Sequence, residues 1–197
     1  MTYIETIPPN QADPTVTALY DAHRAALGHL PNFAQAFSLR PDVYAAWQQL
    51  NGAIKANMDL RRYELATIAA ARELRSSYCM LAHGSVLADQ YLAPDDLQAI
   101  VEDHQDAGLD PVEVAVMDLA EKVARDATTV TEADIERLRS LGLDDAEILD
   151  VVLAASARCF FSKALDGIGA QPDSRFTQQL GPELCDALTV GRPIADD

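Results

Sequence analysis

The sequence has few cysteines, few basic residues and few aromatics. Its three cysteines, Cys79, Cys159 and Cys185, are odd in number and widely spaced. They predict no disulfide framework and favour a reducing, cytoplasmic environment. Only 15 Lys and Arg stand against 31 Asp and Glu, which gives a formal net charge of −16 over 197 residues. This balance argues against nucleic-acid binding and against docking on an anionic membrane.

Long apolar runs and strand patterns are also missing. No window approaches the roughly 18 uninterrupted apolar residues of a membrane-spanning helix. The first residues, MTYIETIPPN, lack the basic and apolar regions of a secretory signal. No segment combines two-residue alternation with β-branched enrichment and hairpin turns. We therefore expect neither a membrane segment nor a sheet.

Helical periodicity is present throughout, and the 49% of apolar residues excludes wholesale disorder. Proline or a polar cap marks most helix starts, and glycine marks several ends, as Pro14 and Gly28 do for the first helix. The pattern predicts an all-α fold of about nine helices in one domain, residues 1–170. A C-terminal tail, residues 171–197, is expected to hold one short helix near 183–188 and then to fray.

Several of the expected helices carry an aligned apolar face, including the third and the ninth. After Pro41, the aligned apolar residues are Val43, Trp47, Leu50 and Ile54. In the ninth helix, after Asp144, the expected buried residues are Ile148, Leu149, Val152, Ala155, Cys159 and Phe160. This places Cys159 in the core, where free cysteine is common.

One stretch carries residues suited to chemistry: Glu64, then Ser76, Tyr78, Cys79 and His83. Cys79 and His83 are four residues apart and share a helix face. A thiol in a first helical turn is stabilised as the thiolate by free N–H groups and the helix dipole. If the two helices pack as an antiparallel pair, Glu64 orients His83 and the three residues form a proton relay. The alternative is a buried cysteine beside a hydrogen-bonded core histidine.

The run YELATIAAARELRSSYCMLAHGSVL resembles the signature of the alkylhydroperoxidase AhpD-like, or carboxymuconolactone decarboxylase, superfamily. That signature is a Glu, eleven residues, then Cys-x-x-Cys-x-x-x-His. Glu64, Cys79 and His83 fall on its Glu, second Cys and His. Other segments, such as ALYDAHRAALGHLPNF, are similar to the uncharacterised peroxidase-related branch. The resemblance implies an AhpD-like helical fold, assembly as dimers, trimers or hexamers, and a cofactor-free hydroperoxide reductase activity.

The sequence departs from that signature at one position, because Ser76 stands where the first Cys belongs. The cycle between dithiol and disulfide is therefore not expected. The remaining scheme uses one cysteine: Cys79 attacks a hydroperoxide and becomes a sulfenic acid, which an external thiol, or a cysteine from elsewhere, resolves. Ser76 is a candidate hydrogen-bond donor to the thiolate, and Tyr78 a candidate pocket wall.

Two other functions stay open. One is a decarboxylase-like enzyme in which Glu64 and His83 do acid/base work and Cys79 only lines the site. The other is a non-catalytic oligomer that lost the dithiol at Ser76. No cysteine or histidine has metal-ligand spacing and no glycine-rich phosphate motif occurs, so we expect no metal and no cofactor. His29 and His104 lie in polar surroundings and are expected in solvent.

Overall fold

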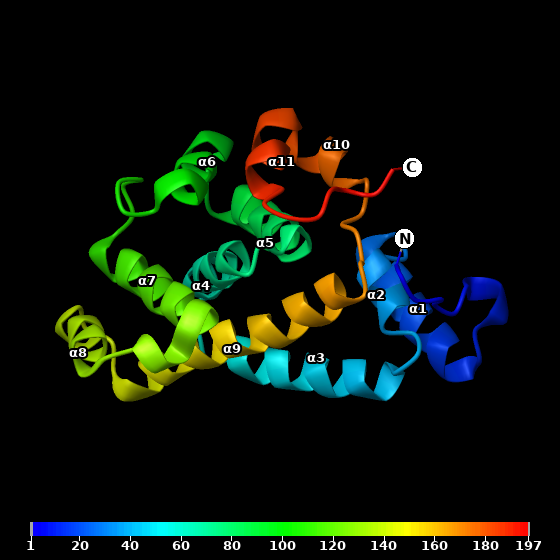
Figure 1. Cartoon of the computed structure of the whole chain (residues 1–197), viewed down its shortest axis with the longest axis horizontal. Coiled ribbons are helices and arrows are strands. Elements are labelled where there is room, and N and C mark those ends of the chain that lie inside the picture. The colour runs from blue at the N-terminus through cyan, green and yellow to red at the C-terminus, as the bar shows by residue number, and fades with distance from the viewer. Residues whose placement is uncertain (1, 197) are drawn as a thin grey trace.

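The computed structural model describes residues 2–196, and within this range it contains helices and turns but no strand (Figure 1). The expected all-α fold is confirmed. The α-helices are α1 (Pro14–Leu27), α2 (Asn32–Ala36), α3 (Pro41–Lys55), α4 (Leu60–Glu73), α5 (Ser77–Gln90), α6 (Pro94–Asp103), α7 (Pro111–Asp126), α8 (Glu132–Ser140), α9 (Asp145–Gly167), α10 (Phe176–Leu180) and α11 (Pro182–Leu188). Short 3-10 turns cover Pro9–Gln11 and Ala127–Thr129.

Local caps explain where the helices begin and end. The Asp13 side chain accepts the Val16 N–H at 2.9 Å and starts α1, and Gly28 ends it in the left-handed region at φ +76°. Asp144 and Glu147 form a capping box at the start of α9. These are the proline, acid and glycine signals that the sequence displays.

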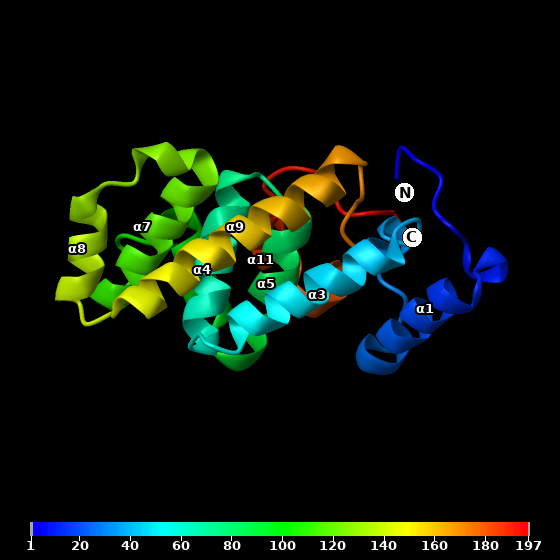
Figure 2. The same ribbon diagram turned by 90° about the horizontal axis from the view of Figure 1, so that it is seen from below.

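Helix α4 is the centre of the molecule and contacts α5, α7 and α9. Its buried residues include the alanines Ala66, Ala69, Ala70 and Ala71. Such small side chains let neighbouring helices approach closely, so α4 is enclosed on most sides. Helix α3 runs beside α9 in both views (Figures 1 and 2). The functional site lies where α3, α4, α5 and α9 meet.

The C-terminal tail corrects one expectation. The short helix near 183–188 is present as α11, but α10 precedes it and the described residues after α11 still contact the rest of the fold. Leu184, Cys185 and Leu188 are buried, and α11 packs against α5 and α6 (Figure 1). Further on, the Ala195 N–H donates to the Pro172 carbonyl at 2.9 Å. The tail therefore closes the same core as the earlier helices.

The inward faces expected for α3 and α9 are partly wrong. Leu149 is 55% exposed, Phe160 46% and Leu50 54%. Helix α9 instead buries a face offset by about one residue, made of Val151, Ala154, Ala155, Ala157, Arg158, Phe161, Ser162 and Leu165 with Ile148. Because α9 carries apolar residues on two sides, its periodicity alone does not select the buried one.

None of the helices among residues 2–196 combines the length and the low charge that crossing a bilayer requires.

Candidate active site

The turn between α4 and α5 places Cys79 in the first turn of α5. Arg75 holds a left-handed φ of +54°, Ser76 is the N-cap, and the helix begins at Ser77, slightly before the start near Cys79 that the sequence suggests. The C-terminal segment braces this turn, because the Gly191 N–H donates to Ser77 Oγ at 2.8 Å. A Cβ at Gly191 would lie 2.0 Å from the Arg75 carbonyl oxygen, so only glycine fits this approach.

The structure brings Glu64 and His83 together, because α4 and α5 pack against each other as an antiparallel pair. His83 Nδ1 donates to a carboxylate oxygen of Glu64. Lys55 Nζ, from the end of α3, binds the other oxygen at 3.0 Å. The Glu64 side chain is 1% exposed, whereas those of His83 and Lys55 are 17% and 39% exposed. The carboxylate is thus buried with both oxygens occupied.

The charges on this pair follow from its surroundings. Burial raises the pKa of Glu64, but His83 and Lys55 more than offset it, so the net shift is downward. Burial also lowers the pKa of His83, and the nearby Arg158 charge lowers it further against the opposing Glu64. At neutral pH Glu64 is ionised and His83 is neutral, which leaves the second ring nitrogen of His83 able to accept a proton.

The sulfur of Cys79 contacts two polar groups of α9. Ser162 Oγ donates to Sγ at 3.2 Å, and Arg158 Nη1 donates to it at 3.5 Å. Cys79 itself is only 1% exposed. Its position therefore provides hydrogen-bond donors and a positive charge, which are the groups that favour a thiolate.

Arg158 is 2% exposed and, among residues 2–196, forms no ion pair with a carboxylate. Its other side-chain hydrogen bond is to the hydroxyl of Tyr63, 3.5 Å from Nη2, and that hydroxyl donates to Asn51 at 2.8 Å. The guanidinium carbon also lies 5.7 Å from the centre of the Phe161 ring. Burial lowers the pKa of Arg158, but the Cys79 sulfur and the Tyr63 hydroxyl beside it more than offset this effect, so the net shift is upward. A buried cation needs a counter-charge, and its ionisable neighbours here are a thiol and a phenol.

Sequence reasoning missed Arg158, Ser162 and Lys55. Arg158 and Ser162 are four residues apart on α9, but the face expected to be buried passes through Cys159 and Phe160. A charged residue and a serine at helical spacing inside an otherwise apolar helix was the available signal.

The two supporting candidates have other surroundings. The Ser76 hydroxyl is buried and makes no hydrogen bond to Cys79 within the described residues; it lies near Asp166, whose pKa burial raises. Tyr78 donates to Asp173 and lines a cavity of about 330 Å³ against α10, as a pocket wall would.

Of the remaining cysteines and histidines, Cys159 is half-buried, whereas Cys185 is 4% exposed. His104 is buried rather than solvated, because its ring bonds Asp118 at 2.9 Å. No group of His, Cys, Asp and Glu within residues 2–196 is arranged to hold a metal ion.

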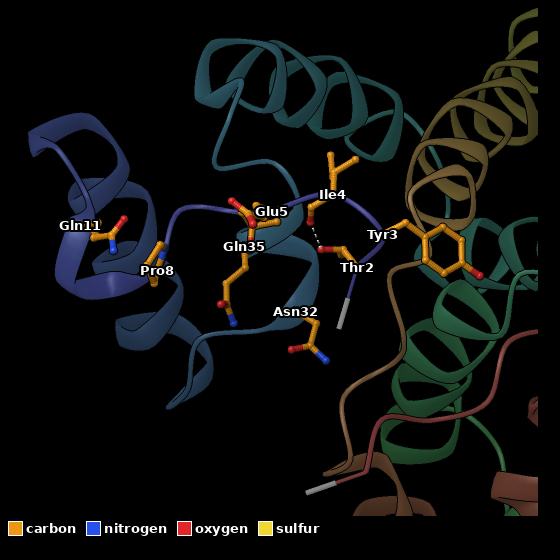
Figure 3. Close-up of a pocket in the computed structure, with 9 residues that line it drawn as sticks. Thr2, Tyr3, Ile4, Glu5, Pro8, Gln11, Asn32 and Gln35 are labelled. Carbon is orange, nitrogen blue, oxygen red and sulfur yellow. Dashed lines mark hydrogen bonds between the residues drawn. The ribbon is translucent and has the colours of Figure 1, made fainter.

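A larger cavity, of about 610 Å³, lies between the N-terminal segment and α2 (Figure 3). Figure 3 shows Gln11, Asn32 and Gln35 among its side chains, and the Tyr3 ring directed away toward α9. Its ionisable side chains are Glu5 and Tyr3, and no thiol or histidine lines it. The reactive groups are therefore gathered around Cys79.

Comparison with known proteins agrees with this architecture. Residues 41–122 match the model of the carboxymuconolactone decarboxylase family. The fold is similar to that of an alkylhydroperoxidase AhpD core, an uncharacterised peroxidase-related protein from Ralstonia eutropha JMP134. The two sequences are 21% identical, the match covers 92% of this chain and 97% of that one, and the TM-score is 0.82. A peroxidase-related protein from Silicibacter sp. TM1040 has 21% identity, coverage of 92% and 95%, and a TM-score of 0.79.

The debrominase Bmp8 in complex with 2,3,4-tribromopyrrole is more distant, with 13% identity, coverage of 89% and 94%, and a TM-score of 0.72. No curated protein sequence matches the chain. At these identities the solved structures establish the shared fold.

Proposed function

We propose that the chain is a thiol-dependent hydroperoxide reductase with Cys79 as its nucleophile, in keeping with the match of residues 41–122 to the carboxymuconolactone decarboxylase family and with the fold that it shares with an AhpD core. The observation that carries the proposal is the contact of the Cys79 sulfur with Arg158, a buried cation that has no carboxylate partner among residues 2–196. A guanidinium beside a cysteine sulfur is one of the groups that make a thiol nucleophilic.

In the first step the Cys79 thiolate attacks the terminal oxygen of a hydroperoxide, R–O–O–H. A sulfur–oxygen bond forms, the O–O bond breaks, and an alkoxide leaves and takes up a proton. The sulfur loses two electrons and becomes a sulfenate, which takes up a proton from water to give the sulfenic acid, and the peroxide gains the two electrons. Arg158 and Ser162 hold the thiolate before the step and the sulfenic oxygen after it.

His83 is the proton carrier in this scheme. It is neutral, and Glu64 fixes the tautomer in which Nδ1 carries the hydrogen, so Nε2 accepts the proton of the peroxide and returns it to the alkoxide. His83 and Lys55 are the more exposed members of the cluster, so substrate approaches from the side where α3 meets α4.

The second half of the cycle requires a thiol from outside the chain. Ser76 supplies none, Cys185 is on the buried face of α11, and Cys159 lies on a different face of α9 from Arg158. An external thiol attacks the sulfenic acid and releases water, leaving a mixed disulfide. A second thiol then restores Cys79 and leaves with the first as a disulfide.

The experiment is trapping of sulfenic acid in the full chain, with peptide mapping after exposure to hydrogen peroxide or an alkyl hydroperoxide. We expect Cys79 to be labelled at least tenfold faster than Cys159 or Cys185, and Cys159→Ser, the matched control, to retain turnover with an external thiol. Equal labelling of the three cysteines, or none at Cys79, contradicts the proposal.

The bonded Glu64 and His83 pair favours one alternative, an acid/base enzyme of the decarboxylase type. The two functions separate by substitution. Cys79→Ser abolishes hydroperoxide reduction under our proposal, whereas an acid/base enzyme tolerates Cys79→Ser and loses activity with His83→Ala.

A further inference from the structure

We propose that the cavity between α5, α10 and the turn joining α1 to α2 binds a small monocarboxylic acid with an apolar body. This α5–α10 cavity has a volume of about 330 Å³. It is a different site from the one around Cys79, which does not line it. The inference stands independently of the proposed peroxide chemistry.

The walls of the cavity determine the body of the ligand. Pro31, Phe33, Ala82, Val86 and Phe176 form them. Ligand sites are typically apolar cavities of about 300–1,000 Å³ with few polar groups, and this one is at the small end. At the roughly 30 Å³ that a water molecule occupies in the liquid, the volume corresponds to about ten non-hydrogen atoms. A medium-length aliphatic chain or a single substituted ring has this size.

Arg175 determines the charge of the ligand. Its Nη1 lies 2.7 and 3.2 Å from the two ring nitrogens of His29, and Nη2 donates to Gln179 at 3.3 Å. Neither partner is anionic, and within residues 2–196 Arg175 forms no ion pair, although the chain has 31 acidic residues. A guanidinium held in this way at the edge of an apolar cavity matches the two oxygens of a carboxylate.

The other polar groups of the cavity are already engaged. Asp173 accepts the Asn32 N–H at 2.9 Å with one oxygen and the Tyr78 hydroxyl with the other. The same Tyr78 hydroxyl accepts the Phe33 N–H at 3.0 Å. The Asp173 charge also opposes a second negative charge in the cavity. A monocarboxylate therefore fits better than a dianionic phosphate.

Calorimetric titration of the full chain with octanoate tests the proposal, and octan-1-ol, octylamine, acetate and octyl phosphate serve as comparison ligands. We expect one octanoate per chain, with each comparison ligand at least tenfold weaker. Arg175→Gln weakens octanoate binding at least tenfold, and Val86→Phe, which fills the cavity, has a similar effect.

The matched control is Arg40→Gln. Arg40 is exposed and lies beside a second apolar cavity, of about 400 Å³, lined by Phe37, Val43 and Phe160. We expect Arg40→Gln to bind octanoate as the parent chain does. Loss of binding in Arg40→Gln, equal binding by Arg175→Gln, or no binding at millimolar octanoate overturns the proposal. If Val86→Phe does not fold, the binding measurement on Arg175→Gln decides the outcome, because Arg175 is only half-buried. None of these results depends on peroxide turnover.

Discussion

At the scale of single residues, the unusual feature is a buried arginine whose side chain hydrogen-bonds a thiol and a phenol. Replacing a buried charge by an apolar side chain of similar volume is often neutral or stabilising, whereas leaving a buried charge without a counter-ion is costly. Arg158 is thus a poor choice for stability alone. Its presence is explained if the guanidinium charge activates the sulfur of Cys79, 3.5 Å away.

Arg158→Met tests this explanation, since it removes the charge and keeps the volume. We expect stability to be unchanged or to rise by about 1 kcal/mol, because an apolar side chain of similar volume replaces a buried charge. Sulfenic acid formation at Cys79 should fall at least tenfold, which corresponds to about 1.4 kcal/mol. Arg158→Lys should recover part of the rate, and Ser162→Ala should lose only a few-fold. Unchanged oxidation in Arg158→Met would show that the guanidinium does not activate the thiol.

The pKa shifts of two histidines predict opposite effects of pH on stability. Burial lowers the His83 pKa, so below about pH 6.5 the unfolded chain takes up the proton first and the free energy of unfolding falls. The hydrogen bond to Asp118 raises the pKa of His104 in the folded chain. The stability that His104 contributes is therefore complete below about pH 6.5, and it is lost as the pH rises through the pKa of the folded state.

Denaturant unfolding measured between pH 5 and 8 separates the two contributions. His83→Asn should flatten the loss of stability on acidification below about pH 6.5, and His104→Asn should flatten the loss on the alkaline side. A steeper acid loss in His83→Asn would mean that the folded state protonates His83 more easily than the unfolded chain does.

At the scale of elements, the C-terminal segment and the α4–α5 turn act as one unit. Gly191→Ala places a Cβ 2.0 Å from the Arg75 carbonyl oxygen. We expect a loss of about 1–3 kcal/mol in unfolding free energy and slower oxidation of Cys79, because the turn before it must shift.

Gly52→Ala is the matched control, since Gly52 lies within α3 and nothing stands within 4 Å of its added Cβ. It should stabilise the chain by about 0.5–1 kcal/mol through helix propensity. If both substitutions have the same sign and Cys79 reactivity is unaffected, the segment does not position the site.

The helices also differ in how much of them could be predicted from the sequence. Proline, acidic caps and glycine are local signals, so α1 to α9 were predictable in order and type. The pairing of Glu64 with His83 was also accessible, because two consecutive helices joined by a tight turn run antiparallel. Arg158 was not, since its role depends on which of two apolar faces α9 buries, and long-range packing makes that choice. His104 was missed for a similar reason, since its partner Asp118 comes from the following helix.

At the scale of the whole molecule, the apolar residues of α3 and α9 that are exposed instead of buried mark a surface of interest. Leu50 on α3 and Leu149, Leu153 and Phe160 on α9 are 38% to 55% exposed. The two helices lie side by side (Figure 2) and also supply Lys55, Arg158 and Ser162 to the site. Contiguous exposed apolar residues are typical of protein interaction surfaces.

We expect this α3–α9 surface to join copies of the chain into a homo-oligomer. With a formal charge of −16, two copies repel each other, so their contact must be apolar and poor in acidic residues. Leu149→Glu with Leu153→Glu places two charges one helical turn apart on the surface. This double variant should be a monomer by light scattering, while the parent chain is a dimer or larger at micromolar concentration.

The control adds the same charge elsewhere, as Ala133→Glu on α8 with Gln178→Glu on α10, both exposed positions. It should assemble as the parent chain does, because general repulsion rises equally in both variants and only the first disrupts the apolar contact. A monomeric parent chain, or a double variant on α9 that assembles unchanged, would rule out the α3–α9 surface as the oligomer interface. The exposed leucines would then require a different partner.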